Sequence, residues 1–448
     1  MNIIIPQAKI VEMMVGKQSI SEVTEYRLLK FCFYQKYEKA LLLYNNLTKE
    51  FLELSPAESE IVLSNYFDTA DEFVRKLIEK WFLVPIAHDD FKLSDQIVNL
   101  TRTLSTDRSV TTYNILPTTA CNARCFYCFE AGTRVSTMDE KTAEAVGNYI
   151  VRHAGGKTVS IQWFGGEPLC NIQAIDIICN KLRDAKVEFV SRIITNGYLF
   201  DEELINRAKN DWQLRLVQIT LDGLQDTYNR AKNYKHNDPN PYARVMDNIG
   251  KILDADIRAH IRLNMDSYNT VELNKLVDEL YARFAHYKKM TIHSNLIYED
   301  VGFVPTSRTD DERAILQEQY FDLCEHVNRL GFTRTLPLKN EIRTNRCMAD
   351  SYNATQITPE GNLGNCEHYP VDDYYGNVFN DDVVQPWNDY ISATELCNDC
   401  AIYPSCYILS RCNTNKCGVF RKKRQYDDLL KSMIYTYKLY LSKKEDRK

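Results

Sequence analysis

The stretch "TTYNILPTTACNARCFYCFE" (Thr111–Glu130) joins an apolar, β-branched segment directly to three cysteines. The segment Thr111–Thr118 has the composition of a buried strand, so the cysteines should lie in the loop at its carboxyl end. Cys121, Cys125 and Cys128 are separated by three and then two residues. Such a tight group in a chain with 14 cysteines predicts a metal or cluster site in this loop.

Three kinds of site are compatible with a cysteine triad. Zinc would need a fourth ligand at finger-like spacing, and the nearest downstream histidine is His153. Buried structural thiols are a second alternative, because cysteine often packs as a small hydrophobic residue. An iron–sulfur cube is the third, since each iron takes one thiolate. Three thiolates on a cube of four irons would leave one iron open for a substrate or cofactor.

The segments around the cysteines alternate between predicted strands and predicted helices. The strand-like segments are "TTYNILPT", "TVSIQWF", "EFVSRIITN", "LRLVQITLDG", "AHIRLNMD" and "MTIHSNLI". Helical segments such as "DEKTAEAVGNYIVRHA" and "VELNKLVDELYARFAH" lie between them. This alternation predicts parallel βαβ units in an α/β fold, and six units favour a partial TIM-like (β/α)6 barrel over a complete one. In such folds the reactive groups collect at the carboxyl ends of the strands.

Four further motifs close the strands that follow the cysteine loop. They are "FGGEP" (Phe164–Pro168), "ITNGY" (Ile194–Tyr198), "TLDG" (Thr220–Gly223) and "RLNMD" (Arg262–Asp266). A single Gly-Gly or Asn-Gly pair after a strand is most often only a turn. Motifs at successive strand ends behind a cysteine triad instead predict one shared binding site.

The C-x3-C-x-aromatic-C pattern, with Tyr127 as its aromatic residue, resembles the radical S-adenosylmethionine (SAM) enzymes. The resemblance covers residues 111 to about 300 and implies a radical SAM barrel. It also implies that the open iron chelates the amino and carboxylate groups of SAM. One electron from the cluster then cleaves the sulfonium to give a 5′-deoxyadenosyl radical, which abstracts a hydrogen atom.

The same resemblance implies which residues contact the cofactor. Glycines allow close backbone approach, and a carboxylate suits the SAM ammonium. The implied SAM contacts are Tyr127; Gly165, Gly166 and Glu167 toward the ammonium; Thr195 and Asn196 toward the carboxylate or ribose; Asp222 as a polar wall; and Asn264 toward the ribose or adenine.

A second group of cysteines crowds residues 345–425, where the hydrophobic periodicity is lost. It consists of Cys347, Cys366, Cys397, Cys400, Cys406, Cys412 and Cys417. Such a segment buries little apolar surface and needs another source of stability, which bound metal can supply. The pattern resembles the SPASM extension of radical SAM enzymes that modify peptides and proteins, which holds two auxiliary [4Fe-4S] clusters. It departs from that extension in having five residues instead of three before Cys412, and a short gap before Cys417.

Carried over from SPASM proteins, the ligand sets divide these cysteines between two clusters. Cys347, Cys366 and Cys412 would hold the first auxiliary cluster, and Cys397, Cys400, Cys406 and Cys417 the second. Either Cys324 completes the first set, or one iron stays open for a substrate thiolate. A packed thiol is the preferred interpretation of Cys324, as of Cys32, Cys170 and Cys179.

Glu367 follows Cys366 directly. In sulfatase-maturing relatives an Asp at this place is proposed to take a proton from the substrate. Glu367 is therefore a candidate catalytic base, and the alternative is that it caps the cysteine loop.

Residues 1–105 are expected to form a separate winged-helix-like module. "KALLLYNNLTKEFLELS" (Lys39–Ser55) predicts a hairpin turning at Asn45-Asn46, with helices after Ser55 and within Thr69–Val84. The arrangement resembles the leader-recognition domains of ribosomal-peptide maturases, which capture a leader as an added strand. The expected divisions are 1–105 for this module, 106–310 for the partial barrel, 311–344 for a bridging helical region, 345–425 for the SPASM extension, and 426–448 for a C-terminal helix and tail.

Composition and charge indicate where the protein is located and which classes of partner it does not bind. The formal net charge is 55 − 61 = −6, which implies no general attraction to nucleic acid or anionic membranes. No apolar run approaches the about 20 residues of a membrane span, and the N-terminus does not resemble a signal peptide. The cytoplasm is the expected location, and its reducing conditions argue against disulfides.

Together these features predict a radical SAM/SPASM maturase with SAM and three [4Fe-4S] clusters. Its substrate would be a ribosomally made precursor peptide with a leader, in which it forms an intramolecular thioether or carbon–carbon crosslink. Its electron donor would be a protein such as flavodoxin or ferredoxin. The alternatives are an anaerobic sulfatase-maturing enzyme that makes formylglycine and, from another class, a non-catalytic iron–sulfur electron carrier. The peptide, the residue modified, the bond formed and the oligomeric state are left open.

Overall fold

The computed structural model describes residues 1–21, 25–104, 110–297, 309–333, 338, 348, 353–366, 374–380 and 419–445. The chain divides into two compact units. The smaller consists of Met1–Thr106, Thr335–Asp350 and Asn388–Lys448, and the larger of Asp107–Arg334 and Ser351–Trp387.

The larger unit is built on a mixed sheet whose central strands are parallel. The described strands run in the order β12-β11-β10-β9-β8-β7-β13-β14-β15. Their bounds are β7 Thr112–Thr118, β8 Val159–Gly165, β9 Phe189–Thr195, β10 Leu214–Leu221, β11 Arg258–Met265, β12 Met290–Leu296, β13 Ala354–Ile357, β14 Asn362–Gly364 and β15 Gly376–Asn377. Strands β7 to β12 pair in parallel in chain order, and β13 adds a further parallel strand beside β7. The predicted α/β fold with six successive βα units is confirmed.

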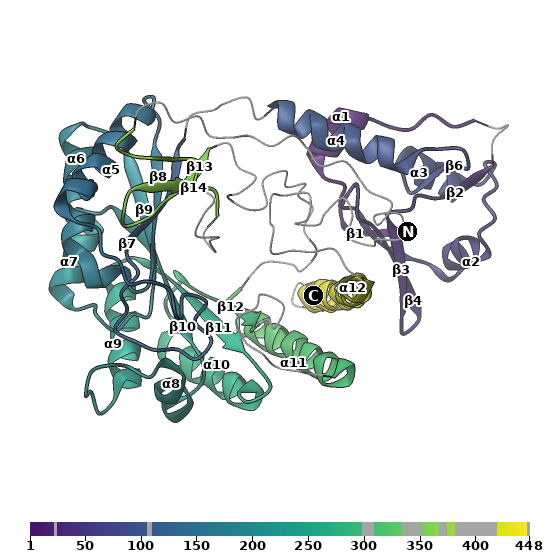
Figure 1. Cartoon of the computed structure of the whole chain (residues 1–448). Coiled ribbons are helices and arrows are strands. Elements are labelled where there is room, and N and C mark those ends of the chain that lie inside the picture. The colour runs from purple at the N-terminus through teal and green to yellow at the C-terminus, as the bar shows by residue number, and fades with distance from the viewer. Residues whose placement is uncertain are drawn as a thin grey trace. The chain divides into compact units, whose positions relative to one another are not determined.

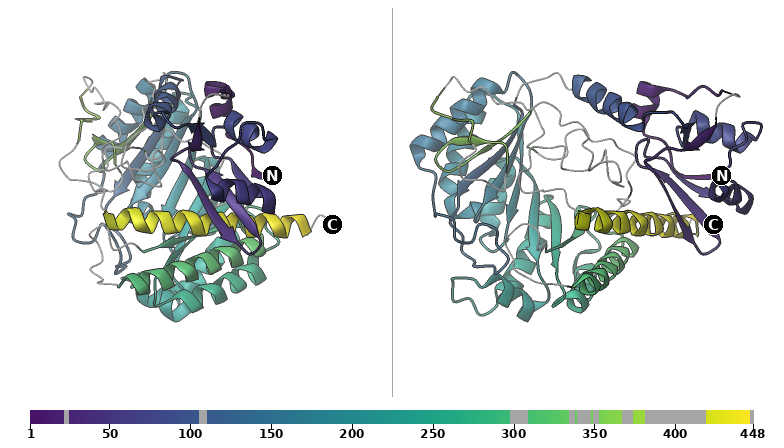
Figure 2. Two further views of the ribbon diagram at one scale, coloured as in Figure 1. Left: turned by 90° about the vertical axis from the view of Figure 1, so that its right-hand side faces the viewer. Right: turned by 45° about the vertical axis from the view of Figure 1, so that its right-hand side comes forward.

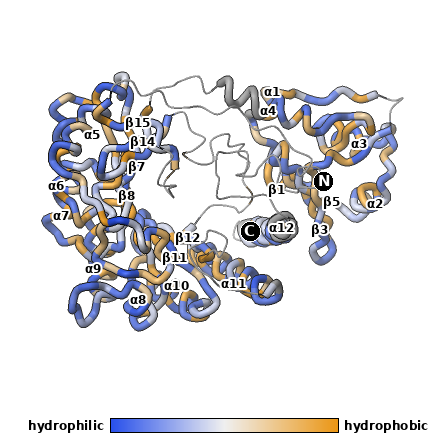
Figure 3. The backbone as a smooth tube through the Cα atoms, in the orientation of Figure 1, coloured by the Kyte–Doolittle hydropathy of each residue, from blue (hydrophilic) through white to orange (hydrophobic). Residues whose placement is uncertain are grey.

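Helices cover one face of this sheet, as α5, α6 and α7 do in Figure 1. The helices are α5 Glu140–His153, α6 Ile172–Asp184, α7 Glu202–Asn210, α8 Gln225–Lys232, α9 Pro241–Asp254, α10 Thr270–Phe284 and α11 Asp310–Arg329, with a short 3-10 helix η1 at Pro168–Asn171. Asp139 and Asp201 cap α5 and α7 by accepting backbone N–H bonds of 2.7 and 2.8 Å. Figure 3 shows apolar residues alternating with polar ones along these helices, as expected for surface helices with one buried side.

Side chains alternate between the two faces of each strand, which sorts the sheet into an apolar and a polar side. On β11, Ala259, Ile261 and Leu263 are fully buried in the core shared with the helices. His260 and Arg262 lie between them in the sequence and face the opposite side. The His260 ring stacks there on His293 of β12, with 4.2 Å between the centroids. The polar side chains of β11 therefore face away from the core that the strand shares with the described helices.

The smaller unit contains a four-stranded antiparallel sheet of order β1-β5-β4-β3 and a two-stranded sheet of β2 and β6. The strands are β1 Asn2–Ile5, β2 Tyr26–Leu28, β3 Cys32–Tyr37, β4 Ala40–Asn45, β5 Phe51–Leu54 and β6 Leu83–Pro85. The predicted hairpin is confirmed, because β4 pairs with β5 in antiparallel register. Its helices are α1 Lys9–Val15, α2 Pro56–Ser64, α3 Glu72–Glu79, α4 Asp90–Leu104 and α12 Val419–Glu445.

Two of these helices show how the unit is assembled. Helix α2 begins at a capping box in which Ser55 and Glu58 satisfy each other's backbone N–H groups. Helix α12 begins earlier than the sequence pattern indicates, and Figure 2 shows it running across β3 and β4. Met433 of α12 is fully buried against Leu42 and Phe51, so this helix completes the core.

Within the described ranges, no helix has the length and apolar composition needed to cross a membrane.

Candidate functional site

The three cysteines of the first group lie in the loop after β7, at the carboxyl end of the sheet. Cys121, Cys125 and Cys128 are all half-buried. The Cys128 N–H donates to the Cys125 carbonyl at 3.1 Å, and the Ala123 N–H donates to the Cys121 sulfur at 3.4 Å. The loop therefore turns back on itself at Cys121 and again between Cys125 and Cys128.

Burial governs the titration of these thiols. It raises the pKa of Cys121 to about 12, and the nearby charges of Glu167 and Cys125 add to the effect. Burial likewise raises the pKa of Cys128. Nearby cations are what stabilise a buried thiolate, so cluster irons would supply the missing positive charge. Among the described residues no three His, Cys, Asp or Glu side chains surround a single ion, whereas a cube takes one thiolate at each of several irons.

The two glycines of "FGGEP" let the end of β8 pack against the cysteine loop. A Cβ at Gly166 would lie 2.4 Å from the carbonyl oxygens of Thr119 and Ala120, and one at Gly165 would lie 2.5 Å from the Thr118 oxygen. The Glu167 N–H donates to the Ala120 oxygen at 2.8 Å. Glycine is thus required here by a backbone contact within the protein.

Glu167 is fully buried and joins the ends of β8 and β9. Its Oε1 accepts the Thr195 hydroxyl at 2.8 Å and the Leu169 N–H at 3.2 Å, and its Oε2 accepts the Asn196 N–H at 2.9 Å. Burial raises the pKa of Glu167 to about 6 despite these bonds. A carboxylate oxygen can accept two bonds, so Oε2 retains capacity for a cationic donor. The structure therefore brings together the predicted residues Glu167, Thr195 and Asn196.

Asn122 is a site residue that the sequence motifs do not indicate. Its Oδ1 accepts a bond from Asn196 Nδ2 at 2.6 Å, which ties the cysteine loop to the end of β9. Its Nδ2 is buried and has no hydrogen-bond partner. A buried unpaired donor next to Cys121 fits an anionic group such as the carboxylate of SAM.

Asp222, at the end of β10, belongs to a buried network with Tyr127 and Lys232. The Tyr127 hydroxyl donates to Asp222 Oδ2 at 2.8 Å, and Lys232 Nζ donates to the Tyr127 oxygen at 2.8 Å. Lys232 Nζ also lies 3.0 Å from Asp222 Oδ2, with the side chains 3% and 0% exposed. Burial disfavours the lysine charge, but Asp222 and Tyr127 outweigh it and raise the pKa of Lys232 well above its ordinary value. The motifs of the sequence analysis do not include Lys232.

The end of α8 and the residues after it contact the other side of the cysteine loop. The Arg124 N–H donates to the carbonyls of Lys232 and Asn233 at 2.9 and 3.1 Å. The Lys235 backbone N–H donates to the Asn122 oxygen at 2.8 Å, and Lys235 Nζ donates to the Cys121 oxygen at 2.6 Å. This segment is a second unpredicted part of the site.

Asn264 is buried at the end of β11, on the same edge of the sheet. Its side-chain oxygen accepts a bond from Arg262 Nε at 3.0 Å. Asn269 Nδ2 donates to the backbone oxygens of both Asn264 and Asp222, at 2.9 and 2.7 Å. Asn264 is therefore linked to the Asp222 strand end.

The second cysteine group falls almost entirely outside the described residues. Cys366, two residues after β14, is half-buried, whereas the following lie outside the described part: Cys347, Cys397, Cys400, Cys406, Cys412, Cys417 and Glu367. Cys324 is half-buried in α11, and burial raises its pKa to about 11. Cys179 is fully buried, as expected of a packed thiol, but Cys170 in η1 is exposed because the short 3-10 helix places it at the surface.

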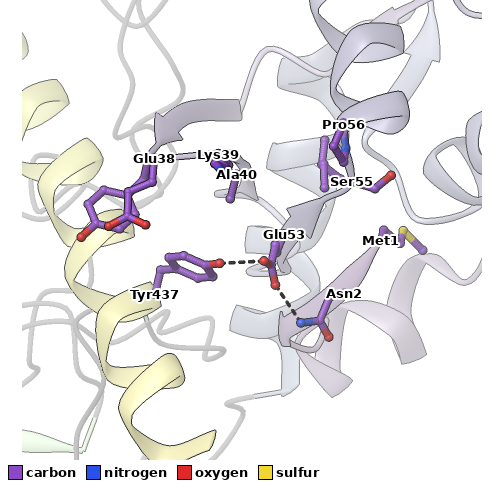
Figure 4. A pocket seen from close by; sticks show the side chains of 11 residues that line it. Met1, Asn2, Glu38, Lys39, Ala40, Glu53, Ser55, Pro56 and Tyr437 are labelled. Carbon is purple, nitrogen blue, oxygen red and sulfur yellow. Dashed lines mark hydrogen bonds between the residues drawn. The ribbon is translucent and has the colours of Figure 1, made fainter. Parts of the chain in front are cut away.

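The smaller unit contains a separate cavity of about 470 Å³ between its sheet and α12. Figure 4 shows Tyr437 and Asn2 pointing at the Glu53 carboxylate, to which they donate bonds of 2.6 and 2.9 Å. None of the predicted cofactor or metal residues lines it.

Comparison with known proteins agrees with the fold. The Radical SAM superfamily matches residues 115–280. "Uncharacterized protein MJ0907" of Methanocaldococcus jannaschii is 31% identical over 24% of this chain and 37% of its own length. A "GTP 3',8-cyclase" of Clostridium perfringens is 21% identical over 58% of this chain and 82% of its own length. The chain thus spans just over a third of the first of these relatives.

A solved structure described as "Native anSMEcpe with bound AdoMet" has the same fold, with a TM-score of 0.56. It is 13% identical and covers 75% of this chain and 100% of its own. Residues 115–280 therefore match the radical SAM domain, and this similarity implies SAM and a [4Fe-4S] cluster as cofactors.

Proposed function

We propose that this chain is a radical SAM maturase that abstracts hydrogen from a ribosomally made precursor peptide and forms an intramolecular thioether or carbon–carbon crosslink. The observation that carries the radical chemistry is the meeting of the cysteine loop with Glu167, Asn196 and Asp222. These residues come from the ends of three successive strands, β8, β9 and β10. The arrangement supports Cys121, Cys125 and Cys128 as ligands of the SAM-binding cluster.

The surrounding residues have donors and acceptors that suit SAM. The bound cluster would supply the one electron that cleaves the SAM sulfonium. Glu167 Oε2 has the charge and the spare lone pair to accept from the SAM ammonium, and Asn122 Nδ2 is a free donor for the carboxylate. Gly165 and Gly166 let the end of β8 pack against the cysteine loop, so these groups lie at the carboxyl end of the sheet.

The peptide substrate is supported by the sequence on either side of the barrel. Residues 345–425 carry the seven cysteines of the SPASM-like pattern, which would hold two auxiliary clusters. Glu367 would be the base that takes a substrate proton. The small sheet of residues 1–105 would bind the leader, and a flavodoxin or ferredoxin would supply electrons.

A nucleotide substrate is the second candidate, because GTP 3',8-cyclases are among the relatives. That similarity covers 58% of this chain, and the C-terminal cysteine pattern favours the peptide. A sulfatase-type substrate oxidised to formylglycine is the remaining alternative within the same chemistry.

The deciding experiment is anaerobic reconstitution of the full chain followed by incubation with SAM and dithionite. We expect 5′-deoxyadenosine, and about 12 iron atoms per chain if three cubes are present, whereas about 4 would remove the auxiliary clusters from the proposal. Coexpression with short peptides encoded beside its gene, read by mass spectrometry, tests the substrate. Loss of two hydrogens from such a peptide, with fragment ions that show two residues joined, supports a crosslink over formylglycine. Consumption of GTP in place of the peptide would favour the nucleotide.

A further inference from the structure

Lys232 holds the cysteine loop on both sides of Cys125. Its backbone carbonyl accepts the Arg124 N–H at 2.9 Å, and its side-chain Nζ donates to the Tyr127 hydroxyl at 2.8 Å. The Cys125 sulfur lies 4.0 Å from the same carbonyl oxygen. One residue from the end of α8 therefore fixes both neighbouring segments of a predicted iron ligand.

The hydroxyl of Tyr127 is fixed in both of its hydrogen-bonding roles. It donates to Asp222 Oδ2 at 2.8 Å and accepts from Lys232 Nζ, which lies 3.0 Å from the same Asp222 oxygen. These three side chains come from the cysteine loop, the end of β10 and the end of α8. Because both partners are charged, the bonds are stronger than neutral ones and hold the ring in one orientation.

The ion pair of Lys232 and Asp222 is buried to an extent that a contribution to stability alone does not explain. Lys232 is 3% exposed and Asp222 is 0% exposed. Apolar residues of similar volume often stabilise a protein as well as a buried ion pair does, so such pairs are better understood as devices that fix geometry. Asp222 Oδ1 is buried without a partner, so this network retains acceptor capacity at the end of β10.

We propose that Lys232 is a positioning residue for the radical SAM reaction. Acting with Asp222, it holds the ring of Tyr127 in the orientation in which the cysteine loop binds SAM beside the open iron. Lys232 itself does not contact the cofactor. The inference rests on the proposed function, in that Cys121, Cys125 and Cys128 hold the SAM-binding cluster.

The test compares the reconstituted full chain with Lys232→Met. This variant keeps the backbone carbonyl that binds Arg124 and removes the Nζ that bonds to Tyr127 and pairs with Asp222. We expect unchanged iron and sulfide content, a rise of about tenfold in the KM for SAM, a much smaller change in kcat for 5′-deoxyadenosine formation, and a weaker SAM-induced change in the EPR spectrum of the reduced cluster. Lys232→Arg, which keeps the charge and the donors, should recover most of the SAM affinity.

Lys251→Met is the matched control. It removes the lysine of another ion pair in the same unit, Lys251–Glu202, but that lysine is 43% exposed and its pair spans 3.8 Å. This variant should retain the wild-type KM and EPR change, because a surface pair contributes little.

Tyr127→Phe keeps the test decisive if Lys232→Met fails to take up iron. It removes only the hydroxyl, and we expect the same rise in the KM for SAM. The double variant should show no further rise, because both changes remove the same hydrogen bond between Lys232 and Tyr127. Normal SAM affinity and a normal EPR change in either single variant would overturn the proposal, as would additive effects. A wild-type chain that binds iron but forms no 5′-deoxyadenosine would overturn the proposed function instead, because the SAM-induced EPR change still reports on Lys232.

Discussion

At the scale of single residues, the motif residues around the cysteine loop stabilise the fold and are also implied to contact the cofactor. Glu167 is the clearest case, because its carboxylate accepts three hydrogen bonds that join β8, β9 and η1. Gly166 is another, since only a residue without a Cβ fits against the carbonyls of Thr119 and Ala120. Substitutions at these positions should therefore change folding as well as catalysis.

The buried charge of Glu167 should make stability depend on pH. Burial raises its pKa from 4.5 to about 6 in the folded protein, so the folded state binds the extra proton between these values. The contribution of Glu167 to the free energy of unfolding should therefore fall by about 2 kcal/mol as the pH rises from about 4.5 to 6. Glu167→Gln carries no charge and should lose this component. Melting temperatures of both proteins between pH 4.5 and 8, measured without SAM, check the difference, and equal pH slopes would contradict it.

The close approach at Gly166 predicts intolerance to the smallest side chain. In Gly166→Ala, the Cβ would meet two backbone oxygens at 2.4 Å, so the end of β8 must move away from the cysteine loop. We expect a loss of about 3 kcal/mol in stability and reduced iron uptake, measured by thermal unfolding and iron analysis.

Gly250→Ala in α9 is the control for the same chemical change. Its Cβ would lie 3.6 Å from Cε1 of the Phe284 ring, which is an ordinary contact. Because alanine favours helices, this variant should be as stable as the wild type or more stable by up to about 1 kcal/mol. Equal behaviour of the two alanine variants would mean that the contact at Gly166 is not restrictive.

Local spacing in the sequence was enough to predict the cysteine loop and the motif residues at the strand ends. It could not predict Asn122 or Lys232, because their partners are far away in the chain. The Asn196–Asn122 bond spans 74 residues, and the Lys232–Tyr127 bond spans 105. Only the folded sheet, which brings several strand ends to one edge, creates these contacts.

At the scale of elements, hydrophobic periodicity and helix capping in the sequence predicted which segments form helices and strands. Only the structure shows which elements pack against each other. The β4–β5 hairpin and the start of α2 at Ser55 follow from turn residues and a capping box. The place of α12 does not, since Tyr437 bonds to Glu53 across 384 residues of sequence. A helix expected at the surface thus has one side in the core of the smaller unit.

Met433 tests that role of α12. It is fully buried among Leu42, Phe51 and Tyr437, so Met433→Ala should cost about 3 kcal/mol and loosen the helix. Hydrogen exchange should then be faster in α12 and in β4 than in the wild type. Met13→Ala, at a residue that is 86% exposed, should change neither measurement. Unchanged exchange in Met433→Ala would show that α12 is held by other contacts.

At the scale of the whole molecule, each unit has an apolar core of its own, and neither core contains a member of the cysteine triad. The radical SAM domain lies in the larger unit, and its cysteine loop sits on a sheet held together by buried side chains of strands and helices. Loss of one cluster should therefore leave the barrel folded. The separate cysteine groups in the sequence predict that clusters can also be lost independently of each other.

Two single substitutions should separate the clusters by function. Cys121→Ser removes a predicted ligand of the SAM-binding cluster, and we expect the loss of about 4 iron atoms per chain and of all 5′-deoxyadenosine formation. Cys400→Ser removes a predicted auxiliary ligand, and it should also lose about 4 iron atoms but still cleave SAM without substrate. Cys121→Ser should have the far-UV circular dichroism of the wild type, because Cys121 does not belong to the apolar cores. Iron analysis and product assays on the anaerobically reconstituted proteins measure both effects. If Cys400→Ser kept all of its iron, the assignment of Cys400 to an auxiliary cluster would be wrong, and if it lost SAM cleavage, the two sites would depend on each other.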